Sequence, residues 1–301
     1  MAQTGAVESR GNGRESDHWR NKQMLLILSR VVRDPKGITG LAILATLLTV
    51  AVAAPLLAPY SPVKIVTGTH LLPPSAQFPF GTDELGRDIM SRVIHGSRLS
   101  MAVGSVAVLA AALVGVTTGL LAGYFGGRLD ALIMRMWDCL LAFPAVFLGI
   151  GIVAALGPGP INALIAVAIV NIPIFSRVTR AITLAEKPKE YAEAARALGA
   201  SHAHILLRTI LPNCTAPIIV QITIAVPTAI LLEAAMSYLG LGTQPPDPAW
   251  GTMLHTAQMH LRRAPWYGLF PGLALTMLIL GLNFFCDSLQ DALDPRRQRK
   301  A

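Results

Sequence analysis

The sequence predicts an all-α, polytopic membrane protein with six transmembrane helices, and three observations support this fold class. Hydrophobic residues make up 53% of the 301 residues and charged residues only 14%, whereas an average soluble domain has about 25% charged residues. Six apolar segments reach the length of about 20 residues that a helix needs to cross a hydrocarbon layer of ~30 Å. Lysine and arginine gather in alternate loops, which is typical of multi-pass membrane proteins.

Long segments without charged residues define the spans in chain order. The first span covers residues 37–59, and the second lies in the charge-free run 99–127. The next run, 139–176, is divided by GPGP at 157–160, because paired glycine and proline end helices. Its first half is long enough to span the membrane when it begins near residue 131. The last two spans cover residues 209–232 and 264–286, which completes a membrane core over residues 99–290.

The basic residues predict which ends of the spans face the cytoplasm. Of the 25 lysine and arginine residues, 19 lie in residues 1–36, 128–135, 177–208 and 296–300. The positive-inside rule therefore places both termini in the cytoplasm, with residues 1–36 and 291–301 as cytoplasmic tails and residues 60–98 as an extracytoplasmic segment. Trp19 and the apolar stripe after it predict either a helix lying in the inner interface or a helical extension of the first span.

Several functional classes lack their sequence signatures. The chain has no GxxxxGK[ST] loop, HExxH motif or GxSxG elbow, so it is predicted neither to bind ATP in the P-loop manner nor to be an enzyme. Cys139, Cys214 and Cys286 have no CxxC spacing. His202 and His204 have no third ligand nearby, so no metal site is predicted. The basic residues form no single basic face, which argues against nucleic-acid binding.

Three glycines mark a helix-packing surface in the second span. Gly115, Gly119 and Gly123 recur at every fourth position and form a flat stripe that another helix can approach closely. The pattern leaves open whether this neighbouring helix belongs to the same chain or to a partner.

Ionisable residues within the spans are few. Arg135 and Asp138 lie three residues apart on one helix face, so we expect them to pair. Glu233 lies near the outer end of the fifth span, where we expect an interfacial group paired within the bundle, with a functional role as the alternative.

A polar, helix-prone segment separates two apolar runs at residues 190–213, EYAEAARALGASHAHILLRTILPN. Gly199 is positioned as a left-handed helix cap, and Ser201 can begin a second helix. This second helix is expected to end where Pro212 opens the fifth span. The segment therefore predicts two short cytoplasmic helices joined by a bend.

The first of these helices has a small apolar face formed by Tyr191, Ala194, Ala195 and Leu198 at helical spacing. Small alanines allow a helix to lie deep in a groove of another protein, with Tyr191 and Leu198 as anchors. A solvated amphipathic loop is the alternative on periodicity alone.

The same segment resembles the cytoplasmic EAA motif of ABC importer permeases. In that motif EAA is followed after three residues by glycine and later by a Leu-Pro ending. The matching residues here are Glu193, Ala194, Ala195, Gly199, Leu211 and Pro212. The resemblance implies that the loop at 180–212 contains a coupling helix, which docks in a cleft of an ATPase subunit.

Longer stretches resemble the C-type permease of dipeptide, oligopeptide and nickel importers. They are FPFGTDELGRDIMSRVIHGSRLSMAVG at 78–104, SYLGLGTQPPDPAWGTML at 237–254 and DALDPR at 291–296. The resemblance covers residues 35–296 and implies the type I permease fold with six spans in the bacterial cytoplasmic membrane.

This resemblance implies an importer of di- or oligopeptides in which the chain is a non-catalytic permease subunit. Its implied partners are a B-type sister permease, two ABC ATPase subunits that bind ATP and Mg²⁺, an extracytoplasmic peptide-binding protein and membrane lipid. The chain itself is expected to hold no cofactor. Nickel or another small solute is the alternative cargo, and an ion-coupled secondary transporter is the alternative from another class.

The outer segment GTDELGRDIMSRVIHG leaves two interpretations open. Leu85, Ile89 and Val93 fall on one helical face, which favours a helix on the outer membrane surface that contacts the binding protein or the sister permease. The alternative is a lid packed on the bundle of the same chain.

Overall fold

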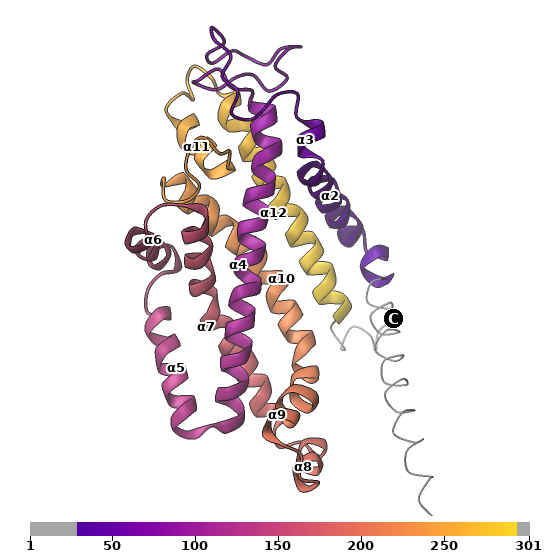
Figure 1. Ribbon diagram of the computed structural model, residues 1–301. Coiled ribbons are helices and arrows are strands. Elements are labelled where there is room, and N and C mark those ends of the chain that lie inside the picture. Colours follow the sequence, from indigo (N-terminus) through magenta and orange to yellow (C-terminus); the bar gives the residue numbers. More distant parts are fainter. Residues whose placement is uncertain (1–28, 294–301) are drawn as a thin grey trace, which may run out of the picture.

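The computed structural model describes residues 29–293 as a bundle of helices (Figure 1). Within these residues the backbone forms no named strand, only an isolated bridge between Thr82 and Asp88. The predicted interfacial helix begins outside the described residues, and most of the predicted tail 291–301 also lies outside them.

Five long apolar helices form the membrane-spanning part of the described chain. They are α2 (Pro35–Val52), α4 (Ile89–Phe125), α7 (Pro160–Glu186), α10 (Leu211–Tyr238) and α12 (Trp266–Leu293). A sixth span is obtained when the bent pair α5 (Gly127–Leu141) and α6 (Ala145–Leu156) is counted as one. Because α4 begins at Ile89, the predicted boundary between residues 98 and 99 lies inside this helix.

The third predicted span is not one continuous helix, so that prediction needs correction. Helices α5 and α6 meet at an angle of 93°. Pro144 at the start of α6 has extended backbone, with ψ 135°, and has no N–H to continue the hydrogen bonds of α5. Pro144 is a residue type that tends to bend a span, but the charge-free run stays uninterrupted across it, so hydropathy does not reveal the break.

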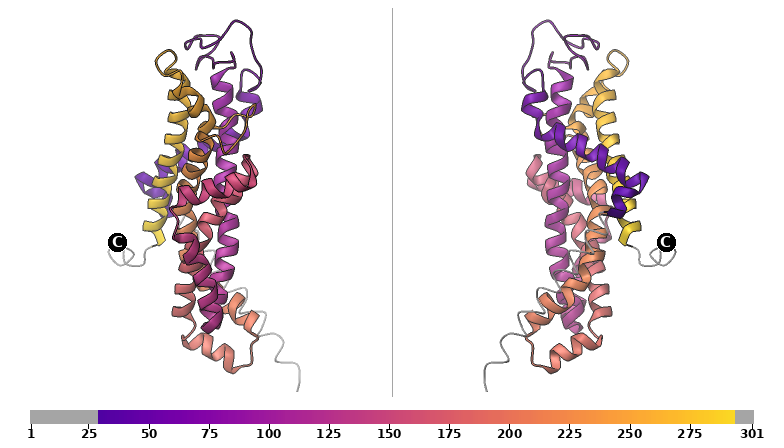
Figure 2. Two further views of the ribbon diagram at one scale, coloured as in Figure 1. Left: turned by 90° about the vertical axis from the view of Figure 1, so that its left-hand side faces the viewer. Right: turned by 90° about the vertical axis from the view of Figure 1, so that its right-hand side faces the viewer.

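Helices α4 and α7 form the most extensive helix pair of the bundle, and the glycine stripe lies between them. A Cβ atom at Gly115 would lie 2.5 Å from Phe175 Cβ, and one at Gly123 would lie 2.7 Å from Thr183 Cβ. The stripe therefore packs against a helix of the same chain, at a separation that side chains larger than glycine would prevent. Figure 2 shows α2 running obliquely across this bundle.

The two ends of the bundle carry different structures. Residues 58–88, α3 (Ala54–Leu57) and α11 (Trp250–Gln258) lie at one end, which is called the outer end here after the predicted topology (Figure 1). Helix α8 (Glu190–Ala197) lies at the opposite, inner end.

The outer segment is a lid on its own bundle rather than a surface helix. Residues 81–88 form no helix, and Gly81 and Gly86 both have positive φ. Ile89 and Val93 are buried in an apolar cluster, while Leu85 is exposed. The predicted helical face through these three residues is therefore wrong, because local turns override the helical spacing.

Candidate functional site

The segment with the EAA motif forms a bent elbow at the inner end of the bundle. Helix α8 (Glu190–Ala197) is followed by Gly199 in the left-handed conformation, with φ +80°. The N–H groups of Gly199 and Ala200 donate back to carbonyls of the last helical turn, in the pattern of a Schellman cap. The bend was predicted, and residues 190–204 are called the elbow below.

The second predicted short helix is the beginning of the fifth span, so that prediction needs correction. Ser201 caps α9 (His202–His204), which continues through a π-helical turn, η1 (Ile205–Ile210), directly into α10. Leu211 is half-buried and Pro212 is exposed in the first turn of α10. Because proline supplies no N–H, the wider turn before it replaces a regular helical turn.

The elbow presents part of its predicted face outward and part inward. Leu198 is 89% exposed, and Glu193 and Ala194 are also exposed. Ala195 is half-buried against an apolar cluster at the ends of α4 and α10, and Ala192, which the sequence analysis did not single out, is fully buried. A docking partner can therefore reach Leu198 and Ala194, while Ala192 and Ala195 face the protein.

Tyr191 joins the elbow to two spans. Its hydroxyl donates to the Glu186 carboxylate at the end of α7 and accepts a hydrogen bond of 3.2 Å from Asn213 Nδ2 in α10. Burial and the bond to Glu186 raise the pKa of Tyr191 to about 12. The hydroxyl consequently stays protonated at neutral pH and keeps its donor role.

A second connection joins the elbow to the inner end of α4. Tyr124 Oη lies 2.8 Å from His202 Nδ1, and Lys187 Nζ donates to Tyr124 O at 2.7 Å. His202 was considered from the sequence only as a metal ligand, and Tyr124 was assigned no role. These contacts join residues far apart in the chain, so no local spacing could have indicated them.

Ion pairs tie α5 to α7 near the elbow. Arg180 donates to both oxygens of Asp130, at 2.5 and 2.6 Å, in a bidentate pair. Asp138 accepts from Arg177 Nη2 at 2.6 Å, so the expected pairing of Asp138 with Arg135 is wrong. The observed partner lies on α7, which packs against α5.

A buried polar cluster organises the outer end. Asp83 is fully buried and accepts from Arg87 Nε at 2.6 Å, while Arg87 Nη2 donates to Glu84 Oε1 at 3.1 Å. Arg92 Nε lies 3.6 Å from the same Asp83 carboxylate. Each of these four charged groups thus has a partner of opposite sign, which offsets the cost of removing it from water.

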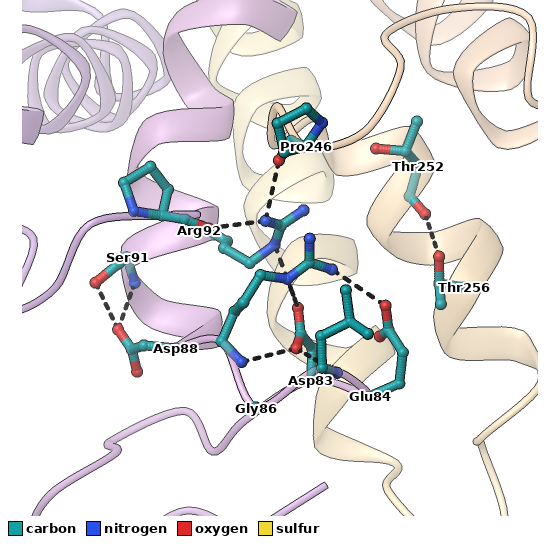
Figure 3. Close-up of polar contacts among 12 residues, drawn as sticks. Asp83, Glu84, Gly86, Asp88, Ser91, Arg92, Pro246, Thr252 and Thr256 are labelled. Atoms are coloured by element: carbon teal, nitrogen blue, oxygen red, sulfur yellow. Dashed lines mark hydrogen bonds and ion pairs between the residues drawn. The ribbon is translucent and has the colours of Figure 1, made fainter. Parts of the chain in front are cut away.

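Arg92 clamps two outer loops together. Its Nη1 donates to Pro62 O at 2.8 Å and to Pro246 O at 3.3 Å, and Figure 3 shows its guanidinium group between Pro246 and Asp83. Neither Asp83 nor Arg92 was predicted from the sequence to have a role. Three acidic and two basic residues within 83–92 are the only local signal that could have indicated a buried cluster.

Glu233 is buried inside the helical bundle. It is 1% exposed, and Ser237 Oγ, on the same helix, donates to its Oε1 at 2.6 Å. The expected pairing within the bundle is present, and the position of Glu233 near the membrane interface stays a prediction. Elsewhere in residues 29–293, no group of three or more His, Cys, Asp or Glu side chains is arranged to hold a metal ion.

Two family models match the sequence. Residues 115–299 match the family described as binding-protein-dependent transport system inner membrane component. Residues 22–74 match the N-terminal transmembrane domain of oligopeptide transport permease C. Together the matches include the elbow, the glycine stripe and the first span.

Similar proteins cover most of the chain. The dipeptide transport system permease protein DppC of Alkalihalophilus pseudofirmus is 47% identical over 88% of this chain and 87% of its own length. The di/tripeptide transport system permease protein DppC of Pseudomonas aeruginosa is 44% identical over 87% of this chain and 88% of its own length. The glutathione transport system permease protein GsiD of Pectobacterium atrosepticum is 41% identical, over 93% and 98% respectively.

A solved structure shares the fold. A chain of the inward-facing MetNI methionine ABC transporter aligns with a TM-score of 0.56 and 18% identity, over 68% of this chain and 98% of that chain. The helical bundle is therefore that of an ABC importer permease, a multi-pass protein of the inner membrane. With a family model over more than half of its length and relatives above 40% identity, the chain belongs to the binding-protein-dependent transport system inner membrane components.

Proposed function

We propose that this chain is the transmembrane permease subunit of an ATP-driven importer of di- and oligopeptides. The observation that carries the proposal is the elbow, which exposes Leu198 at the inner end while hydrogen bonds tie it to α4, α7 and α10. Relatives at 44–47% identity are named as dipeptide and di/tripeptide permeases, which supports peptides as the cargo.

The elbow receives mechanical work from a separate ATPase. Two ATPase subunits bind ATP and Mg²⁺, and α8 lies in a cleft of one of them, with Leu198 as an anchor. When nucleotide closes the ATPase pair, the elbow moves with its subunit and the attached spans rock together. This permease subunit carries out no chemical step itself and holds no cofactor.

The remaining partners complete a transport path across the membrane. A B-type sister permease forms a heterodimer with this chain, and an extracytoplasmic binding protein delivers the peptide to the outer end. Both termini lie in the cytoplasm, in agreement with the distribution of lysine and arginine. Lipid covers the remaining apolar surface of the spans.

The test is uptake by the complete transporter in proteoliposomes. We expect labelled dipeptide to accumulate only when ATP, both permeases, both ATPases and the binding protein are present. A non-hydrolysable ATP analogue is the control and should abolish accumulation. Uptake of nickel without peptide would replace the cargo, and uptake driven by an ion gradient without ATP would overturn the proposal.

A further inference from the structure

An outer pocket opens beside the first turns of α4. Its volume is about 320 Å³, at the low end of the roughly 300–1,000 Å³ typical of small-molecule sites. The pocket is lined mainly by Pro62, His95, Arg98, Leu99, Asp247 and Pro248. Three of these residues belong to one face of α4, and the others come from two outer loops.

The pocket holds one cation and one anion that do not pair with each other. Arg98 is exposed and donates to Val52 O at 3.2 Å, at the end of α2. Asp247 is also exposed. Among residues 29–293, the ion pairs at the outer end involve Asp83, Glu84, Arg87 and Arg92 and leave Arg98 and Asp247 unpaired.

His95 adds a polar group of known orientation. Its Nδ1 lies 2.9 Å from Ser91 O, and a carbonyl oxygen can only accept a hydrogen bond. Nδ1 therefore carries a proton, and Nε2 of the neutral ring is an acceptor. The pocket thus combines a guanidinium donor with carboxylate and imidazole acceptors.

The walls of the pocket are held in place by the buried cluster behind them. Arg92 bonds to the carbonyls of Pro62 and Pro246, which belong to the two loops that form the walls (Figure 3). Trp250 Nε1 donates to Val93 O at 3.0 Å and fixes the second loop to α4. Such preorganisation lowers the entropy that ligand binding costs.

We propose that this pocket is an entry subsite for the zwitterionic main chain of a short peptide. Arg98 binds the terminal carboxylate, for which its planar fork of N–H donors is suited. Asp247 binds the terminal ammonium group, with His95 Nε2 as an additional acceptor. The inference rests on the proposed function and names the chemistry by which the permease recognises its cargo.

The pocket lies at the outer end of α4, where the proposed transport path begins. Below Arg98, the same side of α4 exposes Val106, Leu109 and Leu113. This side of α4 ends in an apolar groove of about 640 Å³ between α4 and residues 203–211, next to the elbow. One open face of α4 therefore leads from the pocket to the elbow.

An anionic lipid headgroup fits the pocket less well. An adjacent apolar groove, lined by Leu48 and Met101, also reaches Arg98 and offers room for an acyl chain. However, a phosphate group on Arg98 would lie in the same pocket as the Asp247 carboxylate. A zwitterion satisfies both charges, whereas an anion satisfies one and is repelled by the other.

The test measures equilibrium binding of radiolabelled dialanine to the purified permease–ATPase complex. The binding protein is left out so that its own selectivity does not affect the result. Dialanine amide and N-acetyl dialanine serve as competitors that lack one charge each. We expect Arg98→Ala to weaken dialanine binding about twofold to fivefold, as for one exposed charge pair, and to leave binding of the amide unchanged. Asp247→Asn should weaken dialanine binding and leave N-acetyl dialanine unchanged.

A control variant and a measurement of bound lipid separate this subsite from other effects. Arg262→Ala removes an exposed outer arginine outside the pocket and should bind dialanine like the wild type. If the wild type imports dialanine but both pocket variants bind and import it normally, the subsite is wrong and the proposed function stands. If Arg98→Ala instead loses only bound phosphatidylglycerol, measured by native mass spectrometry, the pocket is a lipid site. If the complete wild-type transporter imports no peptide, the proposed function itself fails.

Discussion

At the residue scale, single side chains connect the elbow to the bundle. Tyr191 was predicted as an anchor for another protein, and that role remains a prediction. Its hydroxyl, however, bonds within the chain to Glu186 and Asn213, so the same residue joins α8 to α7 and α10. One phenol group thus connects the elbow to two spans.

Tyr191→Phe tests this connection because it removes the hydroxyl and keeps the ring. The loss of these hydrogen bonds should cost about 1 kcal/mol of stability and leave assembly intact. We expect dipeptide uptake per ATP hydrolysed to fall about twofold or more in proteoliposomes. Tyr60→Phe, which alters an exposed hydroxyl at the outer end, is the control. An unchanged uptake-to-ATP ratio in Tyr191→Phe would contradict the transmitting role.

Glu193→Lys tests docking through the exposed side of α8. Glu193 lies in the first helical turn, where a lysine would also oppose the helix dipole. Glu190→Lys makes the same change three residues earlier, in the same helical turn but outside the EAA motif. It therefore controls for the dipole effect. We expect Glu193→Lys to lose co-purification with the ATPase subunits more severely than Glu190→Lys does. Equal retention by both variants would argue against docking at Glu193.

At the element scale, the conformation of one glycine sets the bend of the elbow. Gly199 has φ +80°, and an added Cβ atom would meet nothing within 4 Å. A larger residue is therefore opposed by backbone strain and not by a clash, at a cost of roughly 1–2 kcal/mol. Gly240, after α10 at the outer end, has the same φ and equally open surroundings.

Gly199→Val should consequently reduce both uptake and substrate-stimulated ATP hydrolysis, while complex assembly partly survives. Gly240→Val applies the same strain at the opposite end and serves as the matched control. Gly199→Asn should restore part of the activity, because asparagine tolerates the left-handed conformation. The measurements are dipeptide uptake and phosphate release by the reconstituted transporter. Normal uptake by Gly199→Val would show that the bend has no role in coupling.

The sequence could predict the elements whose conformation is set by residues close together in the chain. The Gly199 cap depends on a few consecutive residues, and the charge-free runs identify the long helices without knowledge of their neighbours. The bend before α6 and the π-helical turn before Pro212 depend on how one proline is accommodated in three dimensions. The predicted surface helix at 81–96 is helical only from Ile89 onward, because Asp83 Oδ1 accepts from the N–H groups of Leu85 and Arg87 and stabilises a turn before it.

The residues of the candidate site likewise divide into those with a local signal in the sequence and those without one. The exposed residues of the elbow, such as Leu198, belong to a short motif that is visible in the sequence. The pairs Tyr124–His202 and Arg92–Pro246 join residues 78 and 154 positions apart. Spacing within one element carries no information about such contacts. A single sequence therefore indicates where the elbow lies but not how it is attached to the spans.

At the scale of the whole molecule, α4 is a continuous rod to which both ends are attached. It has 37 residues, which at 1.5 Å per residue corresponds to about 55 Å. No proline interrupts it, whereas α7, α10 and α12 each contain at least one. Arg92 and Arg98 lie at its outer end, and Tyr124 bonds to the elbow at its inner end.

Val106→Pro tests whether continuity of α4 is required for transport. Val106 is 49% exposed, so the substitution disturbs the backbone of the helix more than its packing. Proline removes one hydrogen bond and clashes with the preceding turn, at a cost of about 3 kcal/mol, and should kink the rod between its two ends. We expect dialanine binding at the outer pocket and docking of the ATPases to persist, while ATP-driven uptake falls at least tenfold. Val106→Ala keeps the helix and should transport normally. Uptake by Val106→Pro at the wild-type rate would show that the two ends communicate through α7, α10 and α12 without α4.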